Sequence, residues 1–239
     1  EKAKSLQGIK SGDDGMFKRM FWENKGENRE WMFCRSTVDI TRHYGGMEYV
    51  MRWKNNGEGL ARLQGLQGWN KKGVAINLMR SLRSSIYIGE KFDSNVGIII
   101  PHIEDTLSSI WVFCESKEFN TQVRNIDSRV NAMTGSLVKV PFDLERWTKV
   151  AEEKYPNGLP LPFSDDPTQW IFHGHPCRSV VWDEDAKWTG FGAIRFDSTV
   201  LHIAVARLLG YRWPAELDPK MELAEEQRAL VSECEALLS

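Results

Sequence analysis

The sequence predicts an α+β fold, with a twisted and mostly antiparallel sheet over residues 1–155 followed by helical connector elements over residues 156–239. Short aromatic and β-branched runs dominate the first hundred residues, which is typical of strands. After residue 100, apolar residues recur at helical spacing. The proline-rich segment 156–167 marks the expected boundary between the two parts.

The strands are expected in short runs separated by glycine- and asparagine-containing turns. The run 96–100 is entirely apolar, so it is expected to be a central strand that Pro101 ends. Residues 58–64 are expected to form a short helix before a glycine-rich loop. The other expected strands cover residues 5–9, 31–34, 48–53, 74–79 and 82–88.

The expected helices begin at residues that commonly cap a helix N-terminus. Asp105-Thr106, Ser116 and Asp143 each precede apolar residues at helical spacing. Residues 137–140 are expected to form a brief strand between the second and third of these helices. The later expected helices cover residues 198–209, which Gly210 ends, and a last helix from Asp218-Pro219 to about Leu238.

The composition is that of a soluble globular protein, with 41% hydrophobic and 27% charged residues. No apolar run reaches the roughly 18 residues that a membrane-spanning helix needs, and the first residues do not resemble a signal peptide. The cysteines are scattered, which fits free thiols in a reducing cytoplasm. They are Cys34, Cys114, Cys177 and Cys234. Both ends of the sequence are expected to be cuts in a longer protein.

Motifs that would indicate catalysis are absent from the sequence. There is no P-loop, G-x-G-x-x-G, G-x-S-x-G or H-E-x-x-H pattern, and no Pro-Pro step occurs. His173 and His175 form the closest histidine pair, but only Cys177 and Asp183 are near as further metal ligands, so a turn is the favoured interpretation. We therefore expect no catalytic residue, cofactor site or metal site in this chain.

Charge is distributed unevenly along the chain. Residues 1–100 contain 17 basic and 11 acidic side chains, a net charge of +6, whereas the remainder has a net charge of −8. Such asymmetry indicates a part that binds a polyanion joined to an acidic part, although a chance imbalance of surface charge is an equally good explanation.

Five segments with recognisable motifs occur in order along the chain. They are residues 8–17 (GIKSGDDGMF), 48–58 (EYVMRWKNNGE), 116–119 (SKEF) with 138–144 (VKVPFDL), 166–170 (DPTQW) and 204–214 (AVARLLGYRWP). Together they resemble the target-recognition region of large adenine-specific DNA methyltransferases, and residues 8–17 are similar to the opening of that region. The family comprises single-chain type IIG restriction-modification methylases and the phage-defence methyltransferases of BREX and DISARM systems.

The resemblance implies that this segment holds double-stranded DNA and reads its sequence. The parent protein would transfer a methyl group from S-adenosylmethionine to adenine N6, with its catalytic domain upstream of this segment and other defence-system subunits as further partners. The base-reading residues of the family vary with the target, so none can be carried over by motif.

A DNA-reading surface needs cations for phosphates and planar donors for bases. Arg80 and Arg83 are expected to flank a strand-to-strand turn and are the first candidates for base reading, while Lys71 and Lys72 suit a phosphate clamp. For each residue, a solvated surface cation is the alternative. The candidate DNA-binding residues are Lys10, Ser11, Gly12, Arg42, Arg52, Lys54, Asn70, Lys71, Lys72, Arg80 and Arg83.

Two other classes of function stay open at this point. A protein-interaction scaffold within a defence complex would fit the acidic second half and the expected terminal helix. A self-standing hydrolase is disfavoured because the sequence shows no nucleophile and base at a recognisable spacing. Trp53 and Trp69 are expected to pack in the core rather than to stack on bases.

Overall fold

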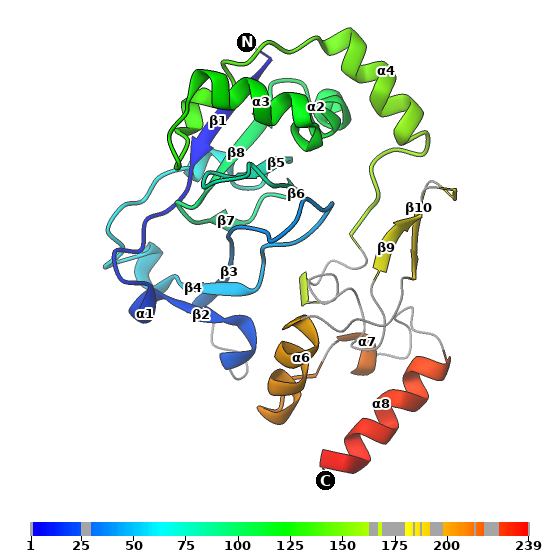
Figure 1. Ribbon diagram of the computed structural model, residues 1–239. Coiled ribbons are helices and arrows are strands. Elements are labelled where there is room, and N and C mark those ends of the chain that lie inside the picture. The colour runs from blue at the N-terminus through cyan, green and yellow to red at the C-terminus, as the bar shows by residue number, and fades with distance from the viewer. Residues whose placement is uncertain are drawn as a thin grey trace. The chain divides into compact units, whose positions relative to one another are not determined.

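The computed structural model has two four-stranded, mostly antiparallel sheets followed by helices, so the α+β prediction is confirmed (Figure 1). It describes residues 2–24, 30–162, 167–168, 180–183, 185–186, 188–191, 198–212, 214–217 and 225–238. Unit 1 comprises Glu1–Phe21 and Asn28–Leu159, and unit 2 comprises Trp22–Glu27 and Pro160–Ser239. The division of the chain into a recognition domain and a connector stays a prediction.

The first sheet of unit 1 has the strand order β1-β8-β5-β6, with all neighbours antiparallel. Every residue of β8 is buried, and β8 lies between β1 and β5, which confirms the prediction of a central strand. This follows from the apolar composition of β8, which suits burial on both faces. The strands are β1 (Ala3–Gln7), β8 (Val96–Pro101), β5 (Gly73–Asn77) and β6 (Ser84–Tyr87).

The second sheet of unit 1 has the order β2-β4-β3-β7, in which only the β3–β7 pair is parallel. β7 is followed within a few residues by β8, so the chain passes directly from the second sheet to the first. Phe92 of β7 belongs to the apolar core of the first sheet. The strands are β2 (Lys18–Met20), β4 (Tyr49–Arg52), β3 (Trp31–Arg35) and β7 (Lys91–Phe92).

Three longer helices of unit 1 follow the first sheet, and α2 packs against β5 and β6. The Ser116 hydroxyl accepts a hydrogen bond from the Phe119 amide (3.1 Å), and Asp143 accepts one from the Arg146 amide (3.1 Å), as the capping residues predict. The helices are α2 (Leu107–Glu115), α3 (Lys117–Ile126) and α4 (Leu144–Lys154), preceded in the chain by the single turn α1 (Asp14–Phe17). Short 3-10 turns cover Phe21–Glu23, Lys54–Asn56, Leu66–Gly68, Glu104–Thr106 and Thr134–Ser136.

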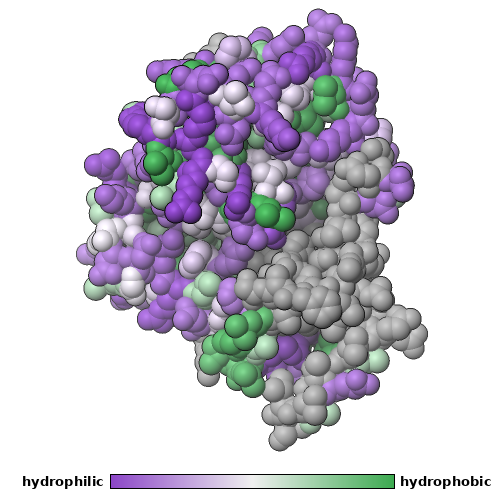
Figure 2. Space-filling model, viewed as in Figure 1, coloured by the Kyte–Doolittle hydropathy of each residue, from purple (hydrophilic) through white to green (hydrophobic). Residues whose placement is uncertain are grey.

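The described residues of unit 2 include a two-stranded antiparallel hairpin and several helices. α6 leaves Leu201 (65%) and Leu208 (72%) exposed, and an apolar patch lies over this helix in Figure 2. The elements are β9 (Val180–Asp183), β10 (Trp188–Phe191), α6 (Ser198–Leu208), α7 (Pro214–Leu217) and α8 (Glu225–Leu238). The expected helix start at Asp218-Pro219 and the His173–His175 pair lie outside the described residues.

The expected helix over residues 58–64 is wrong. Gly57 and Gly59 both have positive φ angles (86° and 88°), and a Cβ at Gly59 would lie 2.9 Å from the Phe17 ring. Arg62 instead pairs with Lys10 through two backbone hydrogen bonds of 3.0 and 3.1 Å. The segment therefore begins in a turn and then pairs at Arg62 with the neighbouring chain, a contact that the local composition did not indicate.

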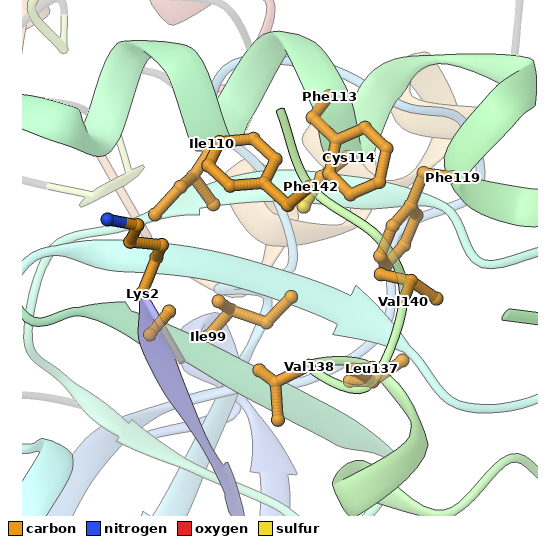
Figure 3. Close-up of a pocket in the computed structure, with 11 residues that line it drawn as sticks. Lys2, Ile99, Ile110, Phe113, Cys114, Phe119, Leu137, Val138, Val140 and Phe142 are labelled. Carbon is orange, nitrogen blue, oxygen red and sulfur yellow. The ribbon is translucent and has the colours of Figure 1, made fainter. Parts of the chain in front are cut away.

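The expected strand over residues 137–140 is also wrong. The Leu137 amide donates to the Thr134 carbonyl (3.0 Å) and the Lys139 amide to the Ser136 carbonyl (3.4 Å), so the chain turns here. Leu137 and Val140 point into an apolar cavity of about 340 Å³ that Phe113 and Phe119 also line (Figure 3). These apolar side chains are buried in the cavity wall and not in a sheet.

Candidate nucleic-acid interface

Several of the candidate residues lie at one end of the first sheet. β5 ends at Asn77, which pairs with Val96 at the start of β8, and Gln7 at the end of β1 pairs with Gly97. Because these strands are antiparallel, the segments that follow β1 and β5 leave the sheet at the end where β8 begins. We call this region, including residues 8–12 and 78–83, the β5–β6 end.

The first segment at this end contains Lys10, Ser11 and Gly12, which line a polar cavity of about 220 Å³ with Ser94 and Asn95. Gly12 has a φ of 85°, and a Cβ there would lie 2.8 Å from the Cβ of Ala61. The Ser11 hydroxyl donates to the Asp14 carboxylate, so it is not free to face a ligand in this conformation. Lys10 is exposed and forms no ion pair with a described residue.

The buried residue Asp93 also lines this cavity. Its carboxylate accepts hydrogen bonds from Lys18 (2.7 Å), the Ser36 hydroxyl (2.8 Å) and the Asn95 amide (2.9 Å). Burial alone would lower the pKa of Lys18, but the nearby carboxylates, Asp93 above all, raise it overall. We interpret this network as structural, because the buried Asp93 carboxylate in the cavity wall already pairs with Lys18.

The second segment is the loop 78–83 between β5 and β6, so Arg80 and Arg83 do flank a strand-to-strand turn, as predicted. Arg80 has a left-handed backbone (φ 55°), and its amide donates to the Val130 carbonyl (3.0 Å). Arg83 lines a polar cavity of about 410 Å³ together with Lys117 and Asn120 of α3. Among the described residues, no carboxylate forms an ion pair with Arg80, Arg83 or Lys117.

One acidic residue, Glu115, also lines the cavity beside Arg83. Its carboxylate lies 2.7 Å from the ammonium of Lys154, and its side chain is only 17% exposed. The charge of Glu115 is therefore largely compensated, and the exposed charge around this cavity is positive.

The lysine pair of the expected phosphate clamp lies at the other end of β5. Lys71 and Lys72 precede Gly73, whereas Arg80 follows Asn77, and the five residues of β5 span about 16 Å. Lys72 forms an ion pair with Glu104 (3.1 Å). Asn70 has a φ of 58° and its amide donates to the Gly89 carbonyl (2.8 Å). The structure thus separates the clamp from the arginine loop.

The remaining candidate cations are engaged with carboxylates. Arg42 pairs with Asp39, while Arg52 (3.4 Å) and Lys54 (3.2 Å) share Glu30. Hydrogen bonding to Lys54, more than any other interaction, lowers the pKa of Glu30. These cations are less available to phosphate than those at the β5–β6 end.

Trp53 and Trp69 pack edge to face, with ring centroids 5.2 Å apart, against the core residues of the second sheet. The ammonium of Lys91 lies 4.6 Å from the Trp53 ring and 4.2 Å from the Trp69 ring, and burial lowers the pKa of Lys91. Because Lys91 occupies these ring faces, the two tryptophans offer no open stacking platform in this conformation.

The cavity of Figure 3 lacks the convergent polar groups that would orient a substrate. Its walls come from β1, β8, α2, α3 and the turn after them, and Lys2 is its one charged lining residue. Burial raises the pKa of the Cys114 thiol in its wall well above the ordinary value, so this thiol is a poor nucleophile. The cavity therefore gives no support to the hydrolase alternative.

Two further cations near the loop 78–83, Lys117 and Arg124, could not be predicted from the sequence. Lys117 directly follows the capping Ser116, and Arg124 lies in the last turn of α3, which are ordinary positions for solvated cations. Only the tertiary packing brings α3 beside the loop 78–83, where Arg124 donates to the Arg80 carbonyl. The sequence contained no signal for this contact, since the residues are 44 positions apart.

No protein-family model matches this chain, and no curated protein matches it. Across the described part of the chain, no group of three or more histidine, cysteine, aspartate or glutamate side chains could hold a metal ion. No helix in that same part is both long and apolar enough to cross a membrane.

Proposed function

We propose that unit 1 binds duplex DNA through the β5–β6 end, as the target-recognition segment of an S-adenosylmethionine-dependent adenine-N6 DNA methyltransferase in restriction-modification or phage defence. The observation that supports the proposal is the group of exposed cations at this end that form no ion pair with a carboxylate of the described residues. The group consists of Lys10, Arg80, Arg83 and Lys117.

Cations without partners favour this face on physical grounds. A lysine or arginine that neutralises a phosphate releases condensed counterions from DNA, which is the main source of affinity that does not depend on sequence. A cation already paired with a carboxylate gains less, because that pair must be broken or shared. Arg80 and Arg83 can also donate two parallel hydrogen bonds to guanine O6 and N7.

Binding to a duplex of random sequence across a salt series tests the proposal. Four phosphate contacts give a slope of about −3.6 when the logarithm of the association constant is plotted against the logarithm of the salt concentration. The affinity should therefore fall by about 150-fold between about 50 and 200 mM salt. Replacing any one of the four cations with alanine should make the slope shallower by about one unit.

Lys71→Ala and Lys72→Ala are matched controls, because they remove the same charge from the opposite end of β5. The four variants at the β5–β6 end should change the slope and the two controls should not. If the controls change the slope and the four variants do not, the binding face is at the other end of β5. A flat salt response of the unmodified chain would contradict DNA binding altogether.

A second candidate is a protein-interaction scaffold, which the exposed leucines of α6 favour. An apolar helical stripe is a common contact surface for a partner protein. The salt series separates the two candidates, since a scaffold needs no salt-dependent affinity for DNA.

A further inference from the structure

Two loops of unit 1 are joined at the β5–β6 end. Met79 pairs with Asn131 in an antiparallel bridge, the Arg80 amide donates to the Val130 carbonyl (3.0 Å), and the Ala132 amide donates to the Leu78 carbonyl (2.8 Å). We call the two loops, residues 78–83 and 127–133, the tip.

The Arg124 guanidinium holds the two loops of the tip together. It donates to the carbonyl oxygens of Arg80 and Arg129, one from each loop. A single side chain from α3 therefore connects both loops to the helix behind them.

Asp127 fixes the conformation of the second loop. It is 4% exposed, and its carboxylate accepts hydrogen bonds from Arg129 Nε and Nη2 (both 2.8 Å), the Met133 amide (2.8 Å) and the Ser136 hydroxyl (3.1 Å). Hydrogen bonding to Arg129, and then to the Met133 amide, lowers the pKa of Asp127 far below its ordinary value. The carboxylate is therefore charged at neutral pH, and its hydrogen bonds connect Arg129, Met133 and Ser136.

The tip displays three exposed apolar side chains. Met79 is 48% exposed, Val130 67% and Met133 57%. Isolated exposed apolar residues are normal, but these three lie on two segments that hydrogen bonds tie together. Arg80 lies among them, and its guanidinium forms no ion pair with a described carboxylate.

Apolar side chains beside exposed cations match the chemistry of a DNA groove. Cations contact phosphates or guanine, and apolar groups contact the C5 methyl of thymine, which only the major groove exposes. A protein partner would need carboxylates opposite Arg80 and Arg83, whereas any duplex supplies phosphates there. Loops held in one conformation before binding also lose little entropy on contact.

We propose that Met79, Val130 and Met133 contact base edges in the major groove of duplex DNA and favour A·T pairs through the thymine methyl group. The proposal rests on the proposed DNA-binding function of the β5–β6 end. It assigns a specificity role to residues 127–133, which the resemblance and the charge pattern do not single out.

Selection from duplexes with a random core, followed by thymine-to-uracil replacement, tests this assignment. The unmodified chain first selects its preferred sequence. Each preferred thymine is then replaced with uracil, which removes only the C5 methyl group. Burial of one methyl-sized group changes affinity by about fourfold, so at least one uracil duplex should bind about fourfold more weakly.

Val130→Ala and Met133→Ala should remove most of this thymine-to-uracil difference while the salt dependence stays unchanged. The matched control is Ile103→Ala, which truncates an exposed side chain (62%) beyond the far end of β8. This control should keep the full fourfold difference.

The outcomes separate the two proposals. A normal salt slope with equal binding of thymine and uracil duplexes overturns the base-contact assignment and leaves DNA binding intact. The assignment is also overturned if Ile103→Ala reduces the thymine-to-uracil difference in affinity as much as Val130→Ala and Met133→Ala do. A flat salt response of the unmodified chain overturns the proposed function itself.

Discussion

Replacing Lys18 with methionine tests the buried ion pair between the two sheets of unit 1. Lys18 belongs to β2 of the second sheet, and Asp93 lies between β7 of that sheet and β8 of the first. The ammonium and carboxylate are 2.7 Å apart, and the two side chains are 8% and 4% exposed. Methionine keeps most of the length of lysine and removes the charge and the donor.

The expected cost is large because the change leaves a buried carboxylate without its cation. Removing one partner of a buried ion pair costs about 3–5 kcal/mol. The Ser36 hydroxyl and the Asn95 amide still donate to Asp93, so the cost should lie near the lower end, at about 3 kcal/mol. A domain of ordinary stability loses a considerable part of its folding free energy by such a change.

Urea unfolding at pH 7 measures this free energy, and Arg19→Met is the matched control. Arg19 is the next residue of β2, is exposed, and stacks on the Trp31 ring at 4.8 Å, so its loss should cost at most about 1 kcal/mol. Combining Lys18→Met with Asp93→Asn should recover part of the penalty, because the buried charge is removed. Equal effects of Lys18→Met and Arg19→Met would refute the reasoning.

The pH dependence gives a second check on the same pair. The folded-state pKa of Lys18 lies above its ordinary value, so the ion pair contributes its full stabilisation at any pH below the ordinary lysine pKa. It is lost as the pH rises through the raised pKa. The unmodified chain should therefore lose stability above about pH 10.4, and Lys18→Met should lack this component.

Two further changes test other buried polar groups. Tyr155→Phe should destabilise unit 1 by about 1–3 kcal/mol in urea unfolding, because the buried Trp111 Nε1–H (3.0 Å from the Tyr155 hydroxyl) loses its acceptor. The control is Tyr49→Phe, which should cost under about 0.5 kcal/mol because the Tyr49 hydroxyl has no hydrogen bond to a described residue. Equal effects of the two changes would contradict this prediction. Asp127 has a lowered folded-state pKa, so its contribution is present above its unfolded pKa of about 3.9 and is lost as the pH falls through the folded value. Asp127→Asn should thus be more destabilising at pH 7 than at pH 2, and an equal penalty at both would contradict the assignment.

Most strands and helices of unit 1 could be predicted because their signals are local. The apolar run 96–100 and the capping residues Ser116 and Asp143 need no information about distant parts of the chain. The two wrong predictions, at 58–64 and 137–140, concern segments whose conformation depends on non-local contacts. In both, a contact with a distant residue or cavity wall decides the conformation, as between Gly59 and Phe17.

The pairing of charges was the part of the candidate site that sequence could not supply. Lys72 and Glu104 are far apart in the chain, as are Lys154 and Glu115, and only tertiary structure brings each pair together. A count of basic residues treats Lys72 and Arg83 alike. Their surroundings differ, because Lys72 already faces a carboxylate and Arg83 faces a polar cavity beside Lys117.

The backbone at Arg80 adds an argument that charge alone does not provide. A left-handed conformation costs a residue with a Cβ about 1–2 kcal/mol, and glycine would adopt it freely. The hydrogen bonds that Arg80 makes to Val130 and Arg124 hold this conformation in place. Arg80 keeps this conformation although glycine would adopt it at lower cost, so the contacts of the tip offset the difference. The constrained backbone sets only where the exposed Arg80 side chain leaves the tip, and this exposed position is compatible with the proposed contact to DNA.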